Sequence, residues 1–255
     1  MMQSLEQQAL FPNLGADHVD VWYCFSHAPG YDHHEWIAKL SPEEAGRYRQ
    51  IRSAHAGRQY LAARMLARST LSRYAGVPEQ AWRFTANEHG RPTIDWPREY
   101  RDIHFSISHT AGLVVIAIGR IPEIGIDVET LDRDVEIQEI AKSVLAEAEA
   151  CELARTAPDA VRDRFFSFWT LKEAYMKARG LGFSLPPRSF EFADLEETIS
   201  LRCAPDCDPD PRRWQFRLSK PKPEYMMALA IGYRIVSQIR HFEWQPASHQ
   251  VRAFA

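Results

Sequence analysis

The chain has 255 residues, of which 45% are hydrophobic and 25% are charged, an ordinary composition for a soluble globular protein. A chain of this length can bury a sizeable core in one compact unit or in two small lobes. Its net charge of −3 argues against nucleic acid as a partner, and we see neither an apolar segment that could span a membrane nor a signal peptide.

The N-terminal half is predicted to combine helices with strands. Ser41, Pro42 and Glu44 have the spacing of a helix start, in which serine caps the first turn and proline opens it. A second helix is expected over residues 57–74. Alternating or continuous apolar side chains predict strands at 19–25, 104–109 and 113–118.

The C-terminal half repeats this order of elements. A strand is expected at 124–129, helices near 137–154 and 159–179, a Pro/Asp-rich loop at 203–213, and strands near 214–218, 225–233 and 241–244. The predicted fold class is therefore α+β with two similar lobes, residues 1–120 and residues 121–255.

The four cysteines do not form the pattern of a disulfide framework. Cys203 and Cys207 could pair or bind a metal, but no second pair of ligands lies nearby in the sequence. Free thiols in a reducing cytoplasm are the favoured interpretation, which predicts a cytoplasmic location.

Two carboxylates lie two positions apart in the strand predicted at 124–129. Side chains of a strand alternate between its faces, so Gly125, Asp127 and Glu129 share one face and the apolar residues share the other. The glycine is expected to leave open space beside the carboxylates. This pattern is suited to a hard divalent cation that holds a phosphorylated ligand.

Glu173 and Lys177 are four residues apart on the last predicted helix and share one of its faces. Alone, such a pair is more often a surface ion pair worth a few tenths of a kcal/mol. Phe166 and Trp169 lie on the same side, so this face is not expected to be simply solvated. A partly buried carboxylate could complete a cation site, and the lysine could hold a phosphate.

Ser108 and His109 end the strand predicted at 104–109. A serine and a histidine suggest nucleophilic hydrolysis, but adjacent residues of a strand point apart, and no Gly-x-Ser-x-Gly elbow occurs in the chain. A capped strand end with a satisfied histidine and a pair of phosphate contacts both remain open.

Residues 39–73 are locally basic, with eight lysines and arginines against two glutamates, a net charge of +6. Most of these side chains fit a solvated helical face, and a few could clamp an anion. The segment Asn87–Pro92 predicts a turn that fixes Arg91.

Taken together, these segments resemble the 4′-phosphopantetheinyl transferases, specifically the type that activates surfactin synthetase. The ordered matching stretches are Gly90-Arg91-Pro92, Phe105 to Thr110, Ile124 to Glu129, and Phe168 to Lys177, continuing through Gly180-Leu181-Gly182 to Ser184-Leu185-Pro186. The resemblance implies a pseudo-twofold α+β fold with coenzyme A in a cleft between the lobes. It also implies transfer of the phosphopantetheine arm to a serine of an apo acyl or peptidyl carrier protein, with Mg²⁺ as cofactor and adenosine 3′,5′-bisphosphate as the second product.

The resemblance also implies roles for individual residues. It assigns the metal to Asp127, Glu129 and Glu173, the reaction centre to Glu173 and Lys177, and the role of general base to Glu149. Contacts to coenzyme A fall to Arg52, Arg58, Arg91, Ser108, His109 and Lys177. The length implies a two-lobed monomer, since members of the shorter class build the equivalent site between subunits.

The chemistry fits these residues independently of the resemblance. Breaking a pyrophosphate requires neutralisation of the charge on its oxygens, and a carboxylate-held Mg²⁺ with a neighbouring lysine can provide it. Two alternatives remain, a non-catalytic protein that binds coenzyme A or a carrier, and a Mg²⁺-dependent phosphohydrolase or nuclease. The carrier could serve fatty acid synthesis, or polyketide and nonribosomal peptide synthesis.

Overall fold

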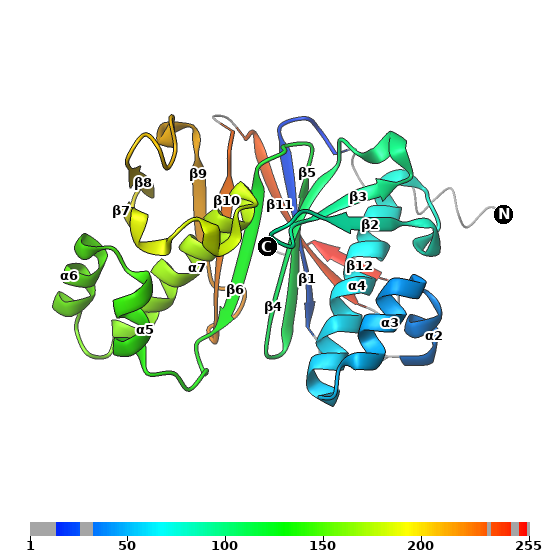
Figure 1. Cartoon of the computed structure of the whole chain (residues 1–255), viewed down its shortest axis with the longest axis horizontal. Coiled ribbons are helices and arrows are strands. Elements are labelled where there is room, and N and C mark those ends of the chain that lie inside the picture. Colours follow the sequence, from blue (N-terminus) through cyan, green and yellow to red (C-terminus); the bar gives the residue numbers. More distant parts are fainter. Residues whose placement is uncertain (1–13, 26–32, 234–235, 246–249, 254–255) are drawn as a thin grey trace. The chain divides into compact units, whose positions relative to one another are not determined.

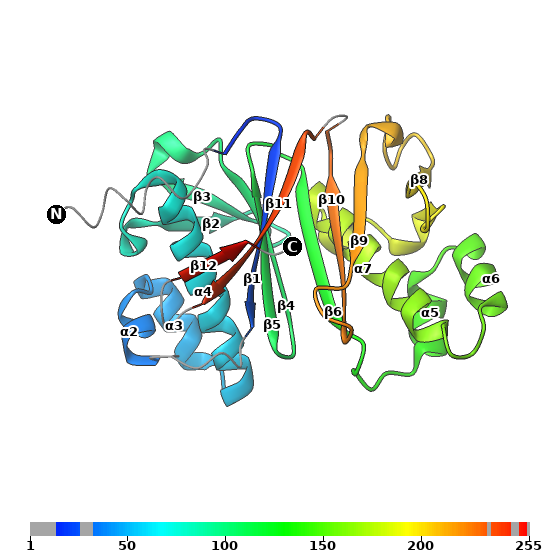
Figure 2. The same ribbon diagram turned by 180° about the vertical axis from the view of Figure 1, so that it is seen from behind.

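The computed structural model describes residues 14–25, 33–233, 236–245 and 250–253 (Figures 1 and 2). These residues form two compact units. Unit 1 contains the described residues up to Ala86, Pro92–Arg120, and those from Val236 onward, and unit 2 contains Asn87–Arg91 and the described part of Ile121–Ile235. Helices and largely antiparallel strands occur in both units, which confirms the predicted α+β class.

Unit 1 is built on a five-stranded sheet with the order β12-β11-β1-β5-β4. Its elements are β1 (His18–Phe25), α2 (His33–Ala38), α3 (Pro42–Gln50), α4 (Ala54–Ala75), β2 (Arg83–Ala86), β3 (Pro92–Trp96), β4 (His104–Thr110), β5 (Leu113–Gly119), β11 (Gln238–Gln245) and β12 (Gln250–Ala253). Strand β11 pairs with β1 in parallel. The predicted division at residue 120 therefore misses that the last strands of the chain return to the N-terminal sheet.

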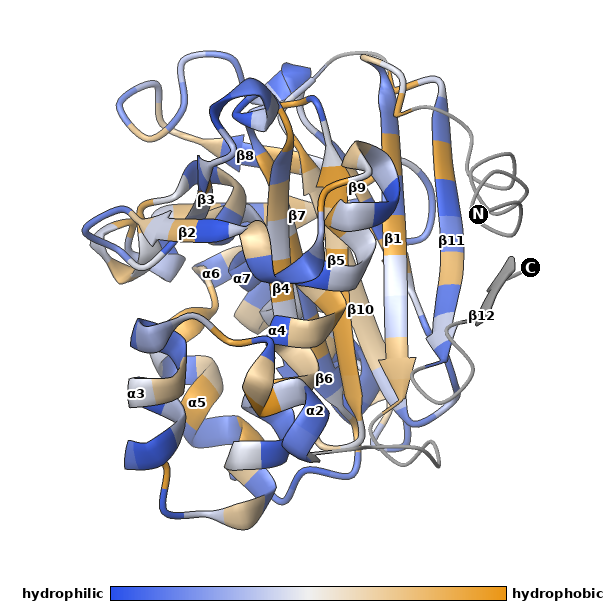
Figure 3. Ribbon diagram, turned by 90° about the vertical axis from the view of Figure 1, so that its right-hand side faces the viewer, coloured by the Kyte–Doolittle hydropathy of each residue, from blue (hydrophilic) through white to orange (hydrophobic). Residues whose placement is uncertain are grey.

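The core of unit 1 lies between α4 and this sheet. Helix α4 begins after the N-cap Ser53 and ends at Gly76, whose left-handed backbone (φ 65°) suits glycine. Leu61, Met65 and Leu66 of α4 are buried, as is every residue of β5, which is largely orange in Figure 3. The capping box predicted at Ser41 is confirmed, with Glu44 as its partner.

Unit 2 is built on a three-stranded antiparallel sheet with the order β6-β10-β9. Its elements are β6 (Ile124–Thr130), α5 (Ile137–Val144), α6 (Glu147–Arg155), α7 (Val161–Arg179), β7 (Phe190–Ala193), β8 (Ser200–Cys203), β9 (Gln215–Ser219) and β10 (Tyr225–Ile231). Helix α7 packs against β6 and β10. The single helix predicted over 137–154 is wrong, because the extended backbone at Leu145 and Ala146 separates α5 from α6.

Helix α7 and strand β6 touch through their backbones at Gly125. A Cβ atom on this glycine would lie 2.0 Å from the carbonyl oxygen of Ala174 and 2.5 Å from the amide nitrogen of Ala178. The expected open space beside Gly125 is therefore wrong, because the backbone of α7 fills it. This close approach positions α7 directly over the face of β6 that carries Asp127 and Glu129.

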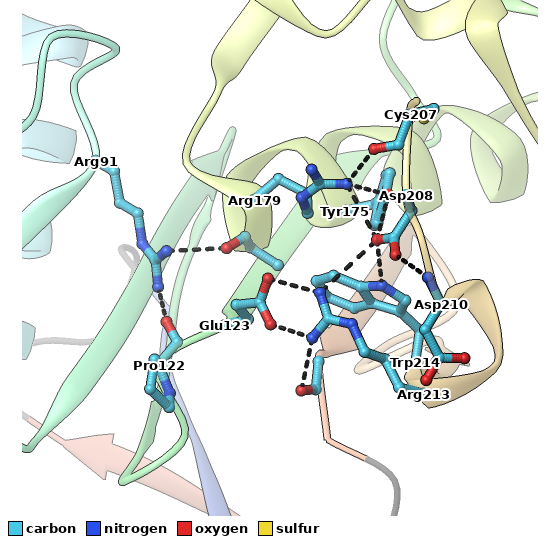
Figure 4. A network of polar contacts seen from close by, with 12 residues as sticks. Arg91, Pro122, Glu123, Tyr175, Arg179, Cys207, Asp208, Asp210, Arg213 and Trp214 are labelled. Atoms are coloured by element: carbon cyan, nitrogen blue, oxygen red, sulfur yellow. Dashed lines mark hydrogen bonds and ion pairs between the residues drawn. The ribbon is translucent and has the colours of Figure 1, made fainter. Parts of the chain in front are cut away.

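A second feature that fixes α7 is the buried carboxylate of Asp208, shown in Figure 4. It accepts hydrogen bonds from the Trp214 indole (2.8 Å), Arg179 (3.0 Å), the Tyr175 hydroxyl (3.1 Å) and the Asp210 amide (3.0 Å). Burial alone would raise the pKa of Asp208, but these donors and the charge of Arg179 outweigh it and hold the pKa below its usual range.

This depressed pKa predicts how acid destabilises the protein. Asp208 contributes stability that is present above the pKa of an unfolded aspartate, about 3.9, and that is lost as the pH falls through the lower folded-state value. Urea unfolding of the wild type is therefore expected to show a steeper loss of stability between about pH 5 and pH 2 than that of Asp208→Asn, which cannot take up this proton. Parallel pH profiles of the two proteins would contradict the assignment.

Candidate active site

The residues predicted to hold the metal or to form the reaction centre lie on two elements of unit 2: Asp127 and Glu129 on β6, and Glu173 and Lys177 on α7. Asp127 is 4% exposed, and its Oδ1 atom lies 2.6 Å from the Lys177 ammonium. Strand alternation directs Asp127 and Glu129 to the face covered by α7, while helical spacing places Glu173 one turn before Lys177. The structure thus brings side chains together that are about 50 residues apart in the sequence.

Glu129 is held by two neighbours. The Trp169 indole donates to its Oε1 atom at 3.0 Å, and an Arg133 nitrogen lies 3.4 Å from both carboxylate oxygens. From the sequence, Trp169 is expected only as a ring on the same side of the helix, and Arg133 is not expected as a neighbour. The only sequence signal for this contact is the spacing of four residues between Glu129 and Arg133. That spacing brings side chains together on a helix, but these two residues lie at the end of a strand.

The three carboxylates act on one another electrostatically. Burial, followed by the charge of Asp127, raises the pKa of Glu173 to about 7. The same two causes raise the pKa of Glu129, against the opposing charge of Arg133. Negative groups that disfavour one another's ionised form in this way would be stabilised by a cation.

The donor set therefore fits a hard divalent cation, since it offers carboxylate oxygens and no soft ligand. Within the described residues, however, no three Asp, Glu, His or Cys side chains are arranged closely enough to hold a metal ion as they stand. The Lys177 ammonium supplies the positive charge next to Asp127.

Glu149, the predicted general base, is buried in an ion pair with Lys172. It is 1% exposed, and its carboxylate accepts from the amides of Ala146 (2.8 Å) and Phe192 (2.9 Å) and from the Lys172 ammonium (2.8 Å). Lys172 in turn donates to the carbonyls of Pro187 (2.8 Å) and Phe190 (2.7 Å). The pair joins α6 and α7 to β7 and to the segment just before it, so these contacts favour a structural role over proton transfer.

Four of the residues predicted to bind coenzyme A lie in unit 1. Ser108 is buried and His109 is exposed on β4, so the two point apart and cannot form a nucleophile–base pair with each other. Arg52 and Arg58 are exposed at the start of α4. The neighbouring Gln59 amide donates to the Thr110 carbonyl at 2.8 Å, which holds the N-terminal end of α4 at the end of β4. This end is favourable for anions, because it combines the helix dipole with arginine charge.

Arg91 lies in unit 2 and has a different environment. Its guanidinium donates to the carbonyl of Ala178 at 2.9 Å and to that of Pro122, as Figure 4 shows. Arg91, which is predicted to contact the coenzyme, therefore also holds two backbone segments of unit 2 together.

Comparison with known proteins gives this arrangement its class. The family model described as the 4′-phosphopantetheinyl transferase superfamily matches residues 123–230, and a model of the N-terminal region of 4′-phosphopantetheinyl transferases matches residues 28–120. The chain is 31% identical over 238 residues to the 4′-phosphopantetheinyl transferase HetI of Nostoc, which covers 92% of this chain and 94% of that protein.

Two further relatives are similar over shorter stretches. The 4′-phosphopantetheinyl transferase Sfp of Bacillus subtilis is 32% identical, with 62% of this chain and 68% of that protein covered. The L-aminoadipate-semialdehyde dehydrogenase-phosphopantetheinyl transferase of Mus musculus is 25% identical, with 77% and 69% covered. The crystal structure of holo-[acyl-carrier-protein] synthase from Thermotoga maritima matches with a TM-score of 0.36 at 23% identity, over 44% of this chain and 62% of that one.

The chain therefore belongs to the 4′-phosphopantetheinyl transferase superfamily. The class of transferase predicted from the motifs is confirmed.

In the part of the chain that the structure describes, no helix combines the length and the apolar composition needed to cross a membrane.

Proposed function

We propose that this protein transfers the 4′-phosphopantetheine arm of coenzyme A to a serine hydroxyl of an apo carrier protein, with Mg²⁺ as cofactor. The observation that supports this most directly is the convergence of Asp127, Glu129, Glu173 and Lys177 from β6 and α7 of unit 2. A carboxylate cluster with an adjacent lysine is suited to a pyrophosphate and its cation.

In the reaction, the serine oxygen forms a bond to the phosphorus that carries the pantetheine arm. The bond from this phosphorus to the bridging oxygen breaks, and adenosine 3′,5′-bisphosphate leaves. Asp127, Glu129 and Glu173 would hold Mg²⁺, which when bound supplies charge neutralisation at the pyrophosphate oxygens. Lys177 offsets the negative charge of the transferring or leaving phosphate. A carboxylate of the site takes the serine proton, directly or through water, and the structural contacts of Glu149 make it a poor candidate.

In unit 1, we propose that Ser108, His109, Arg52 and Arg58 contact phosphates of coenzyme A. The exposed arginines at the N-terminal end of α4 support this proposal. The first turn of that helix, all of which the structure describes, contains no acidic residue to offset their charge.

The clearest test of these contacts is Arg58→Ala. It is expected to raise the KM for coenzyme A about tenfold or more and to change kcat little, since it removes a charge-assisted contact to the ground state and transition state alike. With a coenzyme that lacks the 3′-phosphate, the effect on KM should be much smaller. Equal effects on both coenzymes would count against a 3′-phosphate contact.

The proposed partner is an apo acyl carrier protein or peptidyl carrier domain, which supplies the nucleophilic serine. The exposed Arg47 and Arg49 of α3 are a candidate surface for an acidic carrier. We further propose that the protein works as a cytoplasmic monomer, because one chain supplies both units and its four cysteines are free thiols.

An assay with several carriers tests the proposal. The protein is incubated with coenzyme A, Mg²⁺ and an apo carrier from fatty acid, polyketide or nonribosomal peptide synthesis, and the intact carrier is weighed. The expected result is a gain of one phosphopantetheine arm on at least one carrier. Unchanged masses across the whole panel would favour a protein that binds coenzyme A or carriers without catalysis.

A further inference from the structure

The segment Asn87–Arg91, which joins β2 to β3, is a tight turn organised by Asn87. The Asn87 side-chain oxygen accepts from the amides of His89 (3.0 Å) and Arg91 (2.9 Å), and its backbone amide donates to the Arg91 carbonyl at 3.0 Å. Gly90 supplies the left-handed residue of the turn, with a φ of 84°. The turn therefore presents the Arg91 side chain in a defined direction.

This turn is fastened to the C-terminal end of α7. The Asn87 side-chain amide donates to the Gly180 carbonyl at 2.8 Å, and Arg91 donates to the Ala178 carbonyl at 2.9 Å. The last carbonyls of a helix have no partner within the helix, and a cation near them is favoured by the helix dipole. The turn thus satisfies two carbonyls beside Lys177.

The second contact of Arg91 reaches the other catalytic element. Its remaining terminal nitrogen donates to the carbonyl of Pro122, two residues before β6 begins. One planar guanidinium therefore bridges the end of α7 and the start of β6, as Figure 4 shows. These are the elements that carry Lys177 and Asp127, whose side chains meet at 2.6 Å.

The far side of the same helix end is held independently. Arg179 donates to Asp208 at 3.0 Å, to the Cys207 carbonyl at 2.8 Å and to the Tyr175 hydroxyl at 2.7 Å. With this side fixed, the Arg91 bridge ties the end of α7 to the start of β6, beside the close backbone contact at Gly125.

We infer that Arg91 is a positioning residue for catalysis: by bridging α7 and β6 it holds Lys177 against Asp127, in addition to the backbone contact at Gly125. This inference rests on the proposed transferase function and goes beyond the coenzyme contact that the resemblance implies. A lysine at this position keeps the charge but cannot span two carbonyls in the fixed fork of a guanidinium.

The test compares Arg91→Ala and Arg91→Lys with the wild type in the carrier assay, measuring kcat and KM for coenzyme A. Both substitutions are expected to lower kcat about 10- to 100-fold while KM changes less than about threefold, because misplacement of a catalytic group affects the transition state most. Arg188→Ala, which removes an exposed arginine of the same unit, is the matched control and should keep the wild-type kcat. A raised KM with unchanged kcat in Arg91→Ala, restored by Arg91→Lys, would overturn the inference in favour of a coenzyme contact.

Hydrogen–deuterium exchange of the free protein supplies a readout that does not depend on activity. Peptides covering residues 174–182 are expected to exchange at least about tenfold faster in both Arg91 variants than in the Arg188→Ala control, while α4 is unchanged. Unaltered exchange in 174–182 would overturn the bridge even if activity fell. If the wild type modified no carrier, the proposed function would fail while the exchange experiment still decided whether Arg91 holds α7.

Discussion

Glu173→Gln is expected to lower the rate of phosphopantetheine transfer by at least about 100-fold, because it removes one of three carboxylates proposed to hold the cation at the pyrophosphate. The fold should tolerate the change. Burial and the charge of Asp127 raise the pKa of Glu173 to about 7, so its ionised form is disfavoured in the folded protein. The melting temperature of the variant is therefore expected to equal or exceed that of the wild type.

The matched control for this variant is Asp134→Asn, an exposed carboxylate close to β6 in sequence for which we assign no role at the site. It should leave both the transfer rate and the melting temperature unchanged. Substantial turnover by Glu173→Gln at ordinary Mg²⁺ concentrations would contradict its assignment as a ligand.

The second large effect is expected from Gly125→Ala. The added methyl group would lie 2.0 Å from the Ala174 carbonyl oxygen, and this atom belongs to a helix backbone that cannot rotate away. We expect a loss of about 3 kcal/mol or more in the free energy of unfolding, above the usual range for overpacking because backbone must move. In any protein that folds, α7 would be pushed from β6, and transfer should fall with the separation of Lys177 from Asp127.

Gly46→Ala is the control for this second prediction. Gly46 lies within α3, and a Cβ atom there would meet nothing within 4 Å. Replacement of a helical glycine by alanine should stabilise the protein by about 0.5 to 1 kcal/mol. Urea unfolding measures both variants, and a Gly125→Ala protein as stable as Gly46→Ala would show that α7 does not pack on β6 as described.

The local parts of the fold could be predicted from the sequence because local rules determine them. Alternation placed Asp127 and Glu129 on one face of β6, and the Ser41 capping box marked the start of α3. The return of β11 to pair with β1 depends on contacts more than 200 residues apart, which no local pattern encodes. The shape of the space beside Gly125 was misjudged for the same reason, since α7 fills it.

In the candidate site, too, the contacts between distant segments could not be predicted from local patterns. The residue types and spacing indicated Asp127, Glu129, Glu173 and Lys177, but not the indole of Trp169 that holds Glu129. Glu149 shows a second limit of the sequence. A glutamate on a predicted helix can face a site or a core, and its burial against Lys172 and the Phe192 amide became visible only in three dimensions.

The most direct test of a cation site on β6 and α7 measures carrier modification and its Mg²⁺ dependence together. Wild type, Glu173→Gln and Asp134→Asn are each incubated with coenzyme A and a carrier accepted by the wild type, over a range of Mg²⁺ concentrations, and the intact carrier is weighed. We expect wild type and Asp134→Asn to add one phosphopantetheine arm only when Mg²⁺ is present, and Glu173→Gln to add it at least about 100-fold more slowly. Equal modification by all three proteins, or modification unaffected by removal of the metal, would contradict a cation site on β6 and α7 as the centre of the reaction.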